Sequence, residues 1–473
     1  MNQKPDDTVR TAVVIVHGMG DQLPVDTLKR FLDTALPKLD GRRVYYSRPE
    51  RVTSSFEARR MLAPAIASDE GKGYGQTEFF EYHWSYLMKE NRLDDLFPVV
   101  RRMLLSSPHR VPAGLRVAWA LAWLLIIAFL VTAWKIVKNT APEDRTVTAI
   151  AVSAVGVAGF WVIKWVLTRV GDLVTRSFVD VVRYLDRSPR SYEVRRDIRA
   201  GMVDLLEGLH KDKRYSRIVV VAHSLGAYIA YDGITYLWPQ MCNLHGGPID
   251  DDGPTLPLTG LSELQVAANA VRQASAPTDQ QLTVLRSRQF ELWRQLRLQG
   301  NPWLITDFIS LGTPMYFADL LFAKNRKGFD KLVERAELPV CPPISATKTV
   351  EDPDPQYASY GHPNRGRTVL GHGTPFAVVR WTNLFFPAKL WFFGDWFGGR
   401  LMQLFGKGVL DISIQGNKYG RFLPALAHSR YLSYPDRLGS DDVATLVRHY
   451  LDLDIDAELE PLLQSPKPLP GTD

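Results

Sequence analysis

The chain has few cysteines. Cys242 and Cys341 are the only two in 473 residues, and both lie in stretches that we predict to be loops. Two cysteines do not make a disulfide framework, so the composition favours a reducing compartment. Cysteine and histidine also lack the spacing of a zinc site, and we expect neither a metal nor another cofactor.

Strong charge is missing as well, since the formal net charge is only +6. No basic stripe with interleaved aromatic residues is present, which argues against nucleic-acid binding. Several arginines instead flank apolar segments, as in proteins at a membrane surface. Residues 1–9 lack the apolar core of a signal peptide, so we expect no cleaved leader.

The sequence does contain a serine at a predicted strand-to-helix turn. Residues 218–222 are an apolar β-branched run, typical of a strand buried on both faces, and a helical pattern follows from Leu225. The turn Ala222-His-Ser-Leu-Gly226 fits the pattern G-x-S-x-G, with Ala in the first position. A helix that begins just after Ser224 would direct backbone N–H groups at a developing oxyanion. The alternative is an ordinary turn with a surface serine.

Strand and helix patterns alternate along the chain, which predicts an α/β fold with a mostly parallel sheet. Strands are expected at residues 11–16, 43–47, 77–84, 218–222, 303–311, 376–386 and 408–414. Helices are expected at residues 26–39, 191–210, 261–298 and 440–453.

Four short patches resemble the α/β-hydrolase superfamily, in particular its lipase-like serine esterases. They are Val13-Val-Ile-Val-His-Gly-Met-Gly20, the turn at Ser224, Ile309-Ser-Leu-Gly-Thr-Pro-Met315, and a pair around Asp395 and His428. The resemblance implies a sheet flanked by helices and the chain order serine, acid, histidine. It also implies an oxyanion hole made by the N–H groups of Met19 and Leu225.

Gly18-Met-Gly20 has two other interpretations. A G-x-G turn between strand and helix could open a dinucleotide site, but Leu23 occupies the place of the third glycine. The glycines could also serve backbone geometry alone.

The acid and the base are both expected after Ser224. Asp395 is the only carboxylate in the loop 387–399 and resembles the acid of family members; Asp411, inside a predicted strand, is the runner-up, and Asp307 comes third. His428 resembles the base, because Ala427-His-Ser-Arg-Tyr431 matches a His-Ser-x-Tyr segment of lipase-like proteins.

The other histidines are expected to have different roles. His223 is not expected to be the base, because we expect its side chain to point away along the turn. His17 is expected to form hydrogen bonds beneath the oxyanion loop, and His449 to be structural. His362 and His372 lie in or beside a predicted irregular insertion.

Two uncharged apolar runs, residues 117–134 and 146–163, have 18 residues each. As helices they would each measure roughly 27 Å, close to the thickness of a bilayer core. We therefore predict a transmembrane hairpin of helices at about 117–137 and 146–168, with both outer ends in the cytoplasm because arginines flank them. Core helices of a soluble domain and half-spans within one leaflet are the alternatives.

The predicted domain organisation places this hairpin inside the hydrolase domain. We expect hydrolase residues at 1–100, the hairpin at 101–185, the core with Ser224 at 186–240, a cap-like helical insertion at 241–302, and the rest of the hydrolase at 303–460. This last part includes an irregular insertion at 323–370, and residues 461–473 are expected to be disordered.

Together these features predict a two-pass membrane-anchored serine hydrolase that cleaves lipid or acyl esters through an acyl-enzyme. The aromatic segment 384–397 would contact acyl chains or the lipid interface, or simply pack the core. Such a chain would suit a bacterial inner membrane, with the hydrolase domain facing the cytoplasm. A thioesterase, an amidase, an acyltransferase and a non-catalytic scaffold remain alternatives, and the oligomeric state stays open.

Overall fold

A computed structural model describes the chain in eighteen stretches. They are residues 10–18, 23–35, 45–49, 59–63, 76–88, 101, 103–108, 111, 116–139, 180–185, 189–243, 259–323, 325–344, 359–362, 367–388, 394–414, 427–431 and 441–451.

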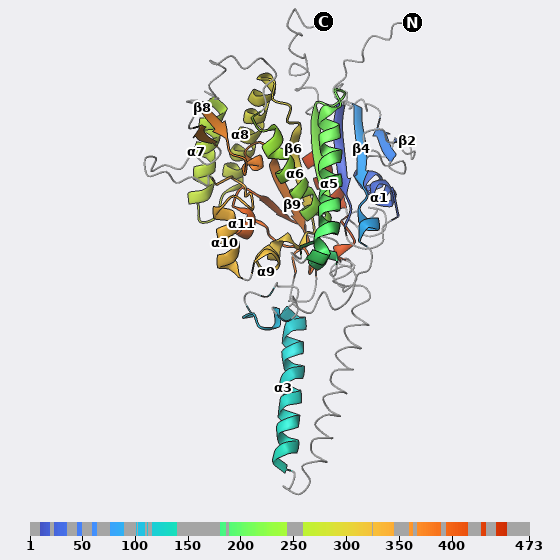
Figure 1. Ribbon diagram of the computed structural model, residues 1–473, viewed down its shortest axis with the longest axis vertical. Helices are drawn as coiled ribbons and strands as arrows, with labels where there is room; N and C mark the ends of the chain where they lie inside the picture. The colour runs from blue at the N-terminus through green and yellow to red at the C-terminus, as the bar shows by residue number, and fades with distance from the viewer. Residues whose placement is uncertain are drawn as a thin grey trace, which may run out of the picture.

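An eight-stranded sheet forms the centre of the molecule, in the order β10-β9-β6-β5-β1-β4-β3-β2 (Figure 1). Its strands are β1 Arg10–Val16, β2 Tyr46–Pro49, β3 Arg59–Ala63, β4 Gln76–Tyr82, β5 Arg217–His223, β6 Ile305–Leu311, β9 Arg380–Phe385 and β10 Leu410–Ser413. The six strands from β10 to β4 are parallel, and β3 and β2 extend the sheet in antiparallel pairing. The predicted α/β fold with a mostly parallel sheet is confirmed.

Helices cover both faces of the sheet because its central strands are apolar on both sides. In β1, Val14 and Val16 belong to a core with α5 (Pro189–Lys211) and α6 (Gly226–Met241). Val13 and Ile15, which alternate with them, belong to a core with α1 (Asp26–Ala35) and α14 (Asp441–Leu451).

The predicted helical stretch 261–298 is two helices, α7 (Thr259–Gln273) and α8 (Asp279–Leu298). A capping box starts α8, because the Thr278 hydroxyl accepts a hydrogen bond from Gln281 N at 3.2 Å and the Gln281 side chain accepts one from Thr278 N at 2.9 Å. The buried Gln289 side chain donates to Phe376 O at 2.7 Å, so α8 packs against the segment that leads into β9.

The expectation that residues 323–370 contain nothing beyond a loop is wrong. They contain α10 (Arg326–Glu334) and the antiparallel pair β7 (Ser359–His362) and β8 (Arg367–Leu370). The Asn325 side chain caps α10 by accepting a hydrogen bond from Gly328 N at 2.9 Å.

Several short helical segments lie between these elements. They are the 3₁₀ helices η1 Ser85–Leu87, η5 Pro314–Phe317 and η6 Pro375–Ala377, and the helices α9 Ala318–Phe322 and α11 Met402–Phe405.

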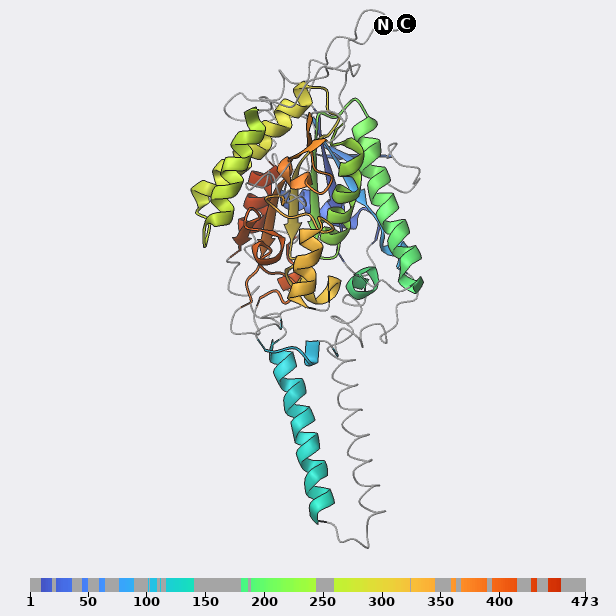
Figure 2. The ribbon, with the colours of Figure 1, turned by 60° about the vertical axis from the view of Figure 1, so that its left-hand side comes forward.

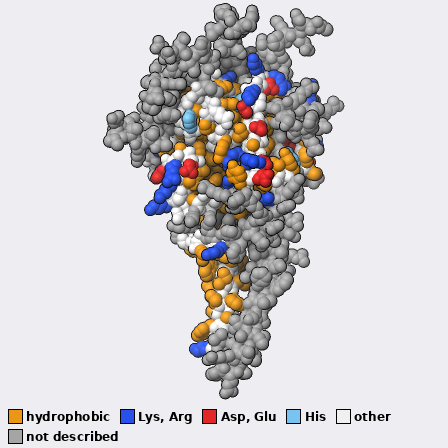
Figure 3. All heavy atoms as spheres, in the orientation of Figure 1, with side chains coloured by type: hydrophobic (Ala, Val, Ile, Leu, Met, Phe, Trp, Pro, Cys, Tyr) orange, Lys and Arg blue, Asp and Glu red, His pale blue; other side chains and the backbone are white. Residues whose placement is uncertain are grey.

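The helix α3 (Arg116–Asn139) projects away from the sheet and its flanking helices (Figures 1 and 2). At its base, the indole N–H groups of Trp119 and Trp123 both donate to Leu104 O, at 3.2 and 3.0 Å. Apolar side chains along the helix are exposed (Figure 3). They include Leu121, Leu124, Leu125, Ile127, Leu130, Val131 and Trp134.

A membrane-crossing hairpin is not found in the part of the chain that the structure describes, where no helix has both the length and the apolarity to span a bilayer. The second predicted helix, about 146–168, lies outside the described residues.

Candidate active site

Ser224 lies on the sharp turn between β5 and α6, with φ at 55° in the left-handed region. Such a conformation is unusual for a residue with a side chain and is held here by the surrounding structure. Ser224 N donates to Leu311 O at 2.9 Å, which fixes the turn to β6. A Cβ at Gly226 would lie 2.5 Å from the carbonyl oxygens of both Val16 and His17, so only glycine lets α6 approach β1 this closely.

His428 bridges Ser224 and Asp395, as the sequence predicts for a base. Its Nε2 lies 2.8 Å from Ser224 Oγ, and its Nδ1 lies 3.0 and 3.1 Å from the two carboxylate oxygens of Asp395. A carboxylate only accepts hydrogen bonds, so Nδ1 carries the proton and Nε2 is free to accept the serine proton. Both Ser224 and Asp395 are fully buried.

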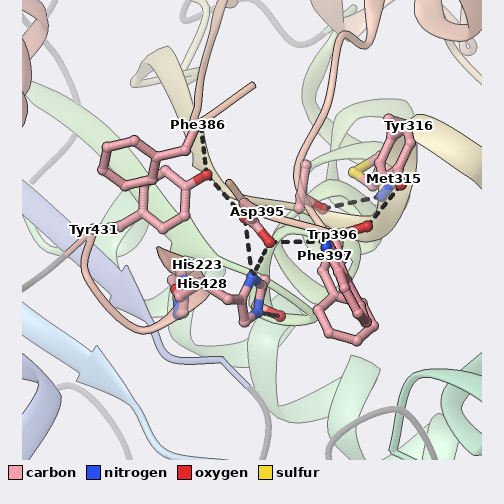
Figure 4. A network of polar contacts seen from close by, with 11 residues as sticks. His223, Met315, Tyr316, Phe386, Asp395, Trp396, Phe397, His428 and Tyr431 are labelled. Atoms are coloured by element: carbon pink, nitrogen blue, oxygen red, sulfur yellow. Dashed lines mark hydrogen bonds and ion pairs between the residues drawn. The ribbon is translucent and has the colours of Figure 1, made fainter. Parts of the chain in front are cut away.

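Asp395 is held by its own network, which Figure 4 shows from close by. Oδ1 accepts a hydrogen bond from Phe397 N at 2.8 Å, and Oδ2 accepts one from the Tyr431 hydroxyl at 2.9 Å. The Tyr431 hydroxyl in turn accepts from Phe386 N at 2.8 Å, just beyond the end of β9. The acid is therefore oriented by neutral donors rather than by cations.

His223 does not point away from the site, contrary to our expectation. Its ring lies 5.0 Å from that of His428, and its Nε2 donates to the main-chain oxygen of His428 at 2.9 Å. Burial lowers the pKa of His223 to about 3, so this imidazole is neutral. It therefore holds the segment of the predicted base through the backbone.

His17 forms hydrogen bonds at the start of the predicted oxyanion loop. Its Nδ1 donates to Gly18 O at 2.8 Å, and its Nε2 accepts from Trp84 N at 3.2 Å. Burial lowers the pKa of His17 to about 3, which keeps it neutral in this role. A Cβ at Gly18 would lie 3.1 Å from Ser224 Cβ, so the described start of the loop lies against the serine. Met19 itself lies outside the described residues, and its role stays a prediction.

Leu225 is the residue that precedes the first turn of α6, and its backbone has ordinary helical angles. Its N–H therefore belongs to the positive end of the helix beside Ser224, which suits binding of an oxyanion.

The two runner-up acids are engaged elsewhere. Asp411 accepts hydrogen bonds from the Asn383 side chain at 2.7 Å and from the backbone N–H groups of Leu401 and Met402 at 3.0 and 2.9 Å. It therefore caps the start of α11. Asp307 is paired with Arg217 and Arg380 instead.

Tyr431 and the contact of His223 with His428 were not predicted. Tyr431 does lie in the quoted His-Ser-x-Tyr segment, three residues after His428, which is the one signal that could have indicated it. The described residues contain no group of three or more histidine, cysteine or acidic side chains arranged to hold a metal ion.

Comparison of the chain with known protein families, with curated proteins and with solved structures finds no match in any of the three.

Proposed function

We propose that this protein is a serine hydrolase with an α/β-hydrolase architecture, which cleaves carboxylic esters through an acyl-enzyme. One observation carries the proposal: His428 lies within hydrogen-bond distance of both Ser224 Oγ and the Asp395 carboxylate. The three residues come from separate parts of the chain and meet where the parallel strands β5, β6 and β9 end.

In the proposed reaction, Ser224 Oγ attacks the ester carbonyl carbon while its proton moves to His428 Nε2. Asp395 holds the imidazole and stabilises its charged form. The N–H groups of Leu225 and, by prediction, Met19 bind the oxyanion. When the carbon–oxygen bond to the alcohol breaks, His428 gives the proton to the leaving oxygen. Water then attacks the acyl-enzyme by the same route and releases the acid and Ser224.

A fluorophosphonate probe tests for an activated serine. Full-length protein in detergent should be labelled, and Ser224→Ala and His428→Ala should not be. Ser262→Ala is a matched control, because this hydroxyl donates to Thr259 O within its own helix, α7. Folded wild type that stays unlabelled would reject the proposal in favour of a non-catalytic scaffold.

Hydrolysis assays with matched esters, thioesters and amides then separate the acyl chemistries. Faster turnover of the ester supports an esterase. Faster turnover of the thioester or amide would replace it with one of the alternatives on the same three residues, and acyl transfer to an added alcohol in preference to water would indicate an acyltransferase.

We also propose that α3 attaches the protein to a lipid membrane and that the substrate is a lipid or acyl ester held there. The exposed apolar side chains of α3 are the first support, since so many together on one helix are unusual in contact with water. The position of α3 is the second, because it leaves the molecule at the end toward which the parallel strands run (Figure 1). Ser224 directly follows the last residue of one of these strands, β5. Burial and the charge of Asp395 raise the pKa of the Tyr316 hydroxyl well above its usual value, and the charge of Arg116, at the base of α3, opposes them in part.

Vesicle flotation tests this attachment. Wild type should float with vesicles, and a variant carrying Leu124→Glu and Leu130→Glu should float less. Val266→Glu with Val284→Glu is the matched control, because these apolar side chains are exposed on α7 and α8, away from α3. Equal flotation of the two variants would reject α3 as the lipid contact.

A further inference from the structure

We propose that Tyr431 is a positioning residue for the reaction, which sets how strongly Asp395 holds the proton of His428. This inference rests on the proposed serine hydrolase. It adds a fourth side chain, one that touches neither the substrate nor the reacting atoms.

The hydrogen bonds of the Tyr431 hydroxyl leave it a single orientation. Its oxygen accepts from Phe386 N at 2.8 Å, so its one proton is directed at Asp395 Oδ2, 2.9 Å away. Burial, reinforced by the neighbouring Asp395 charge, raises the pKa of Tyr431 well above its usual value. The hydroxyl therefore stays protonated and acts as a donor to the carboxylate throughout the working pH range.

Two glycines make room for this contact. Gly312 has φ at 51°, and a Cβ there would overlap the ring of Tyr431. A Cβ at Gly398 would lie 2.5 Å from Asp395 Oδ2 and 2.9 Å from the Tyr431 hydroxyl. The backbone on both sides thus fits closely around the tyrosine–aspartate pair.

The rings around Tyr431 fix its position further. It packs against Phe386, with ring centres 4.7 Å apart, and against His223 at 5.6 Å. His223 also holds the His428 backbone and is neutral because burial lowers its pKa. The Asp395 carboxylate thus accepts hydrogen bonds from the imidazole of His428, the hydroxyl of Tyr431 and the Phe397 N–H.

Removing the Tyr431 hydroxyl should shift the pH profile of the reaction in one predictable direction. A hydrogen bond to a carboxylate stabilises its charged form and weakens its pull on a neighbouring proton. Without the Tyr431 hydroxyl, Asp395 would hold the imidazolium of His428 more strongly. The acidic limb of the pH profile of kcat/KM should then move to higher pH. Looser orientation of the carboxylate should also lower kcat, whereas KM should stay unchanged because Tyr431 does not touch substrate.

The experiment compares the pH profiles of wild type and Tyr431→Phe on one ester substrate. We expect a fall in kcat of about tenfold, the size typical of a lost hydrogen bond to a charged group, together with the upward shift of the acidic limb. Tyr231→Phe is the matched control: it too removes a buried tyrosine hydroxyl, which donates to Pro339 O at 2.8 Å, far from Asp395 in the chain. A Tyr431→Phe profile that coincides with the control would overturn the inference.

A double-mutant cycle sharpens the test, since Tyr431→Phe should have no further effect on kcat when Asp395→Asn is already present. A full additional loss in that background would also overturn the inference.

If Tyr431→Phe does not fold, replacement of Tyr431 by 3-fluorotyrosine keeps the shape and makes the hydroxyl a stronger donor. The acidic limb should then move to lower pH, and an unmoved limb would count against the inference.

Fluorophosphonate labelling of wild type separates the two proposals. Unlabelled wild type rejects the serine hydrolase itself, whereas labelled wild type leaves the pH profiles to decide the role of Tyr431.

Discussion

Two buried charged networks lie at opposite ends of the same three parallel strands. At the amino ends, Asp307 on β6 binds Arg217 of β5 at 2.8 Å and Arg380 of β9 at 2.7 Å. At the carboxyl ends, Asp395 binds His428, which in turn reaches Ser224. Both aspartates are almost completely buried, at 1% and 0% exposure, so burial does not distinguish them.

Their partners do. Burial opposes the charge of Asp307, but Arg380 and Arg217 outweigh it and hold the pKa of this carboxyl well below its usual range. A carboxylate between two guanidinium groups has a permanent charge and no proton to exchange. Asp395 instead accepts hydrogen bonds from a backbone N–H, from the Tyr431 hydroxyl and from the His428 imidazole. The comparison teaches that the charge of the partners separates the structural carboxylate, Asp307, from the one we propose as the catalytic acid, Asp395.

The largest expected effect is on the serine. Ser224→Ala should reduce kcat by about a millionfold, as removal of the nucleophile does in serine hydrolases, because no acyl-enzyme can form. Its melting temperature should equal or exceed that of wild type, since the variant removes only a hydroxyl. Turnover assays and thermal unfolding check this. Retention of hydrolysis would show that Ser224 is not the nucleophile.

Next comes the acid. Asp395→Asn should lower kcat by about ten-thousandfold, because an amide favours the wrong tautomer of His428. Asp411→Asn is the control, and it should lose stability through α11 and keep its kcat. If Asp411→Asn lost kcat in the same turnover assay and Asp395→Asn kept it, Asp411 would be the acid instead.

Mutation of the network at the amino ends of the strands should lower stability and leave kcat nearly unchanged. Asp307→Ala leaves two arginines without their buried carboxylate, and the free energy of unfolding should fall by about 3–5 kcal/mol. The kcat of the folded fraction should stay close to that of wild type. Denaturant unfolding with active-site titration measures both. A comparable loss of kcat would mean that the two networks are not independent.

The same network should affect stability at acid pH. The folded pKa of Asp307 lies below its unfolded value, which is about 3.9, so its contribution is present above that pH and disappears as the pH falls further. The difference in stability between wild type and Asp307→Ala should therefore shrink below about pH 4. A constant difference from pH 7 down to pH 2 would contradict this assignment.

The smallest effect concerns a third carboxyl, at the end of β4. Burial raises the pKa of Glu81 from 4.5 to about 7, so protonation favours the folded state. Stability from this group is complete below the unfolded value and is lost as the pH rises through 7, by at most about 3 kcal/mol. The free energy of unfolding of Glu81→Gln, measured by urea titration, should change less between pH 5 and 8 than that of wild type. An unchanged slope would show that Glu81 does not titrate there.

Sequence patterns were most informative where the structure is local. The strand, turn and helix around Ser224 follow from residues within a few positions of one another, and the central strands follow from unbroken apolar runs. Asp395 and His428 could be predicted only from the resemblance to a known family, since nothing in the local pattern joins residues 33 positions apart. The shared hydrogen bonds of Tyr431 depend on three separate segments, so no single stretch indicates them.

Shorter or more polar elements were harder to predict. β3, Arg59–Ala63, begins with two arginines and lies near the polar edge of the sheet, where an apolar run is not needed. α10 has one buried apolar residue, Phe329, among charged neighbours, too weak a signal to separate it from a loop. The predicted strand 376–386 begins late because Pro375 starts a 3₁₀ helix, η6, before β9.

The order of Ser224, Asp395 and His428 along the chain has a consequence for synthesis. A ribosome adds about 5–20 residues each second, so the 204 residues between Ser224 and His428 take roughly 10–40 s. During that interval the residues of β1, β4 and β5 have already been synthesised, but the segment that bears the imidazole has not. A nascent chain would therefore carry Ser224 without the imidazole of His428, and the proposed hydrolysis could begin only when residues 427–431 have emerged and docked.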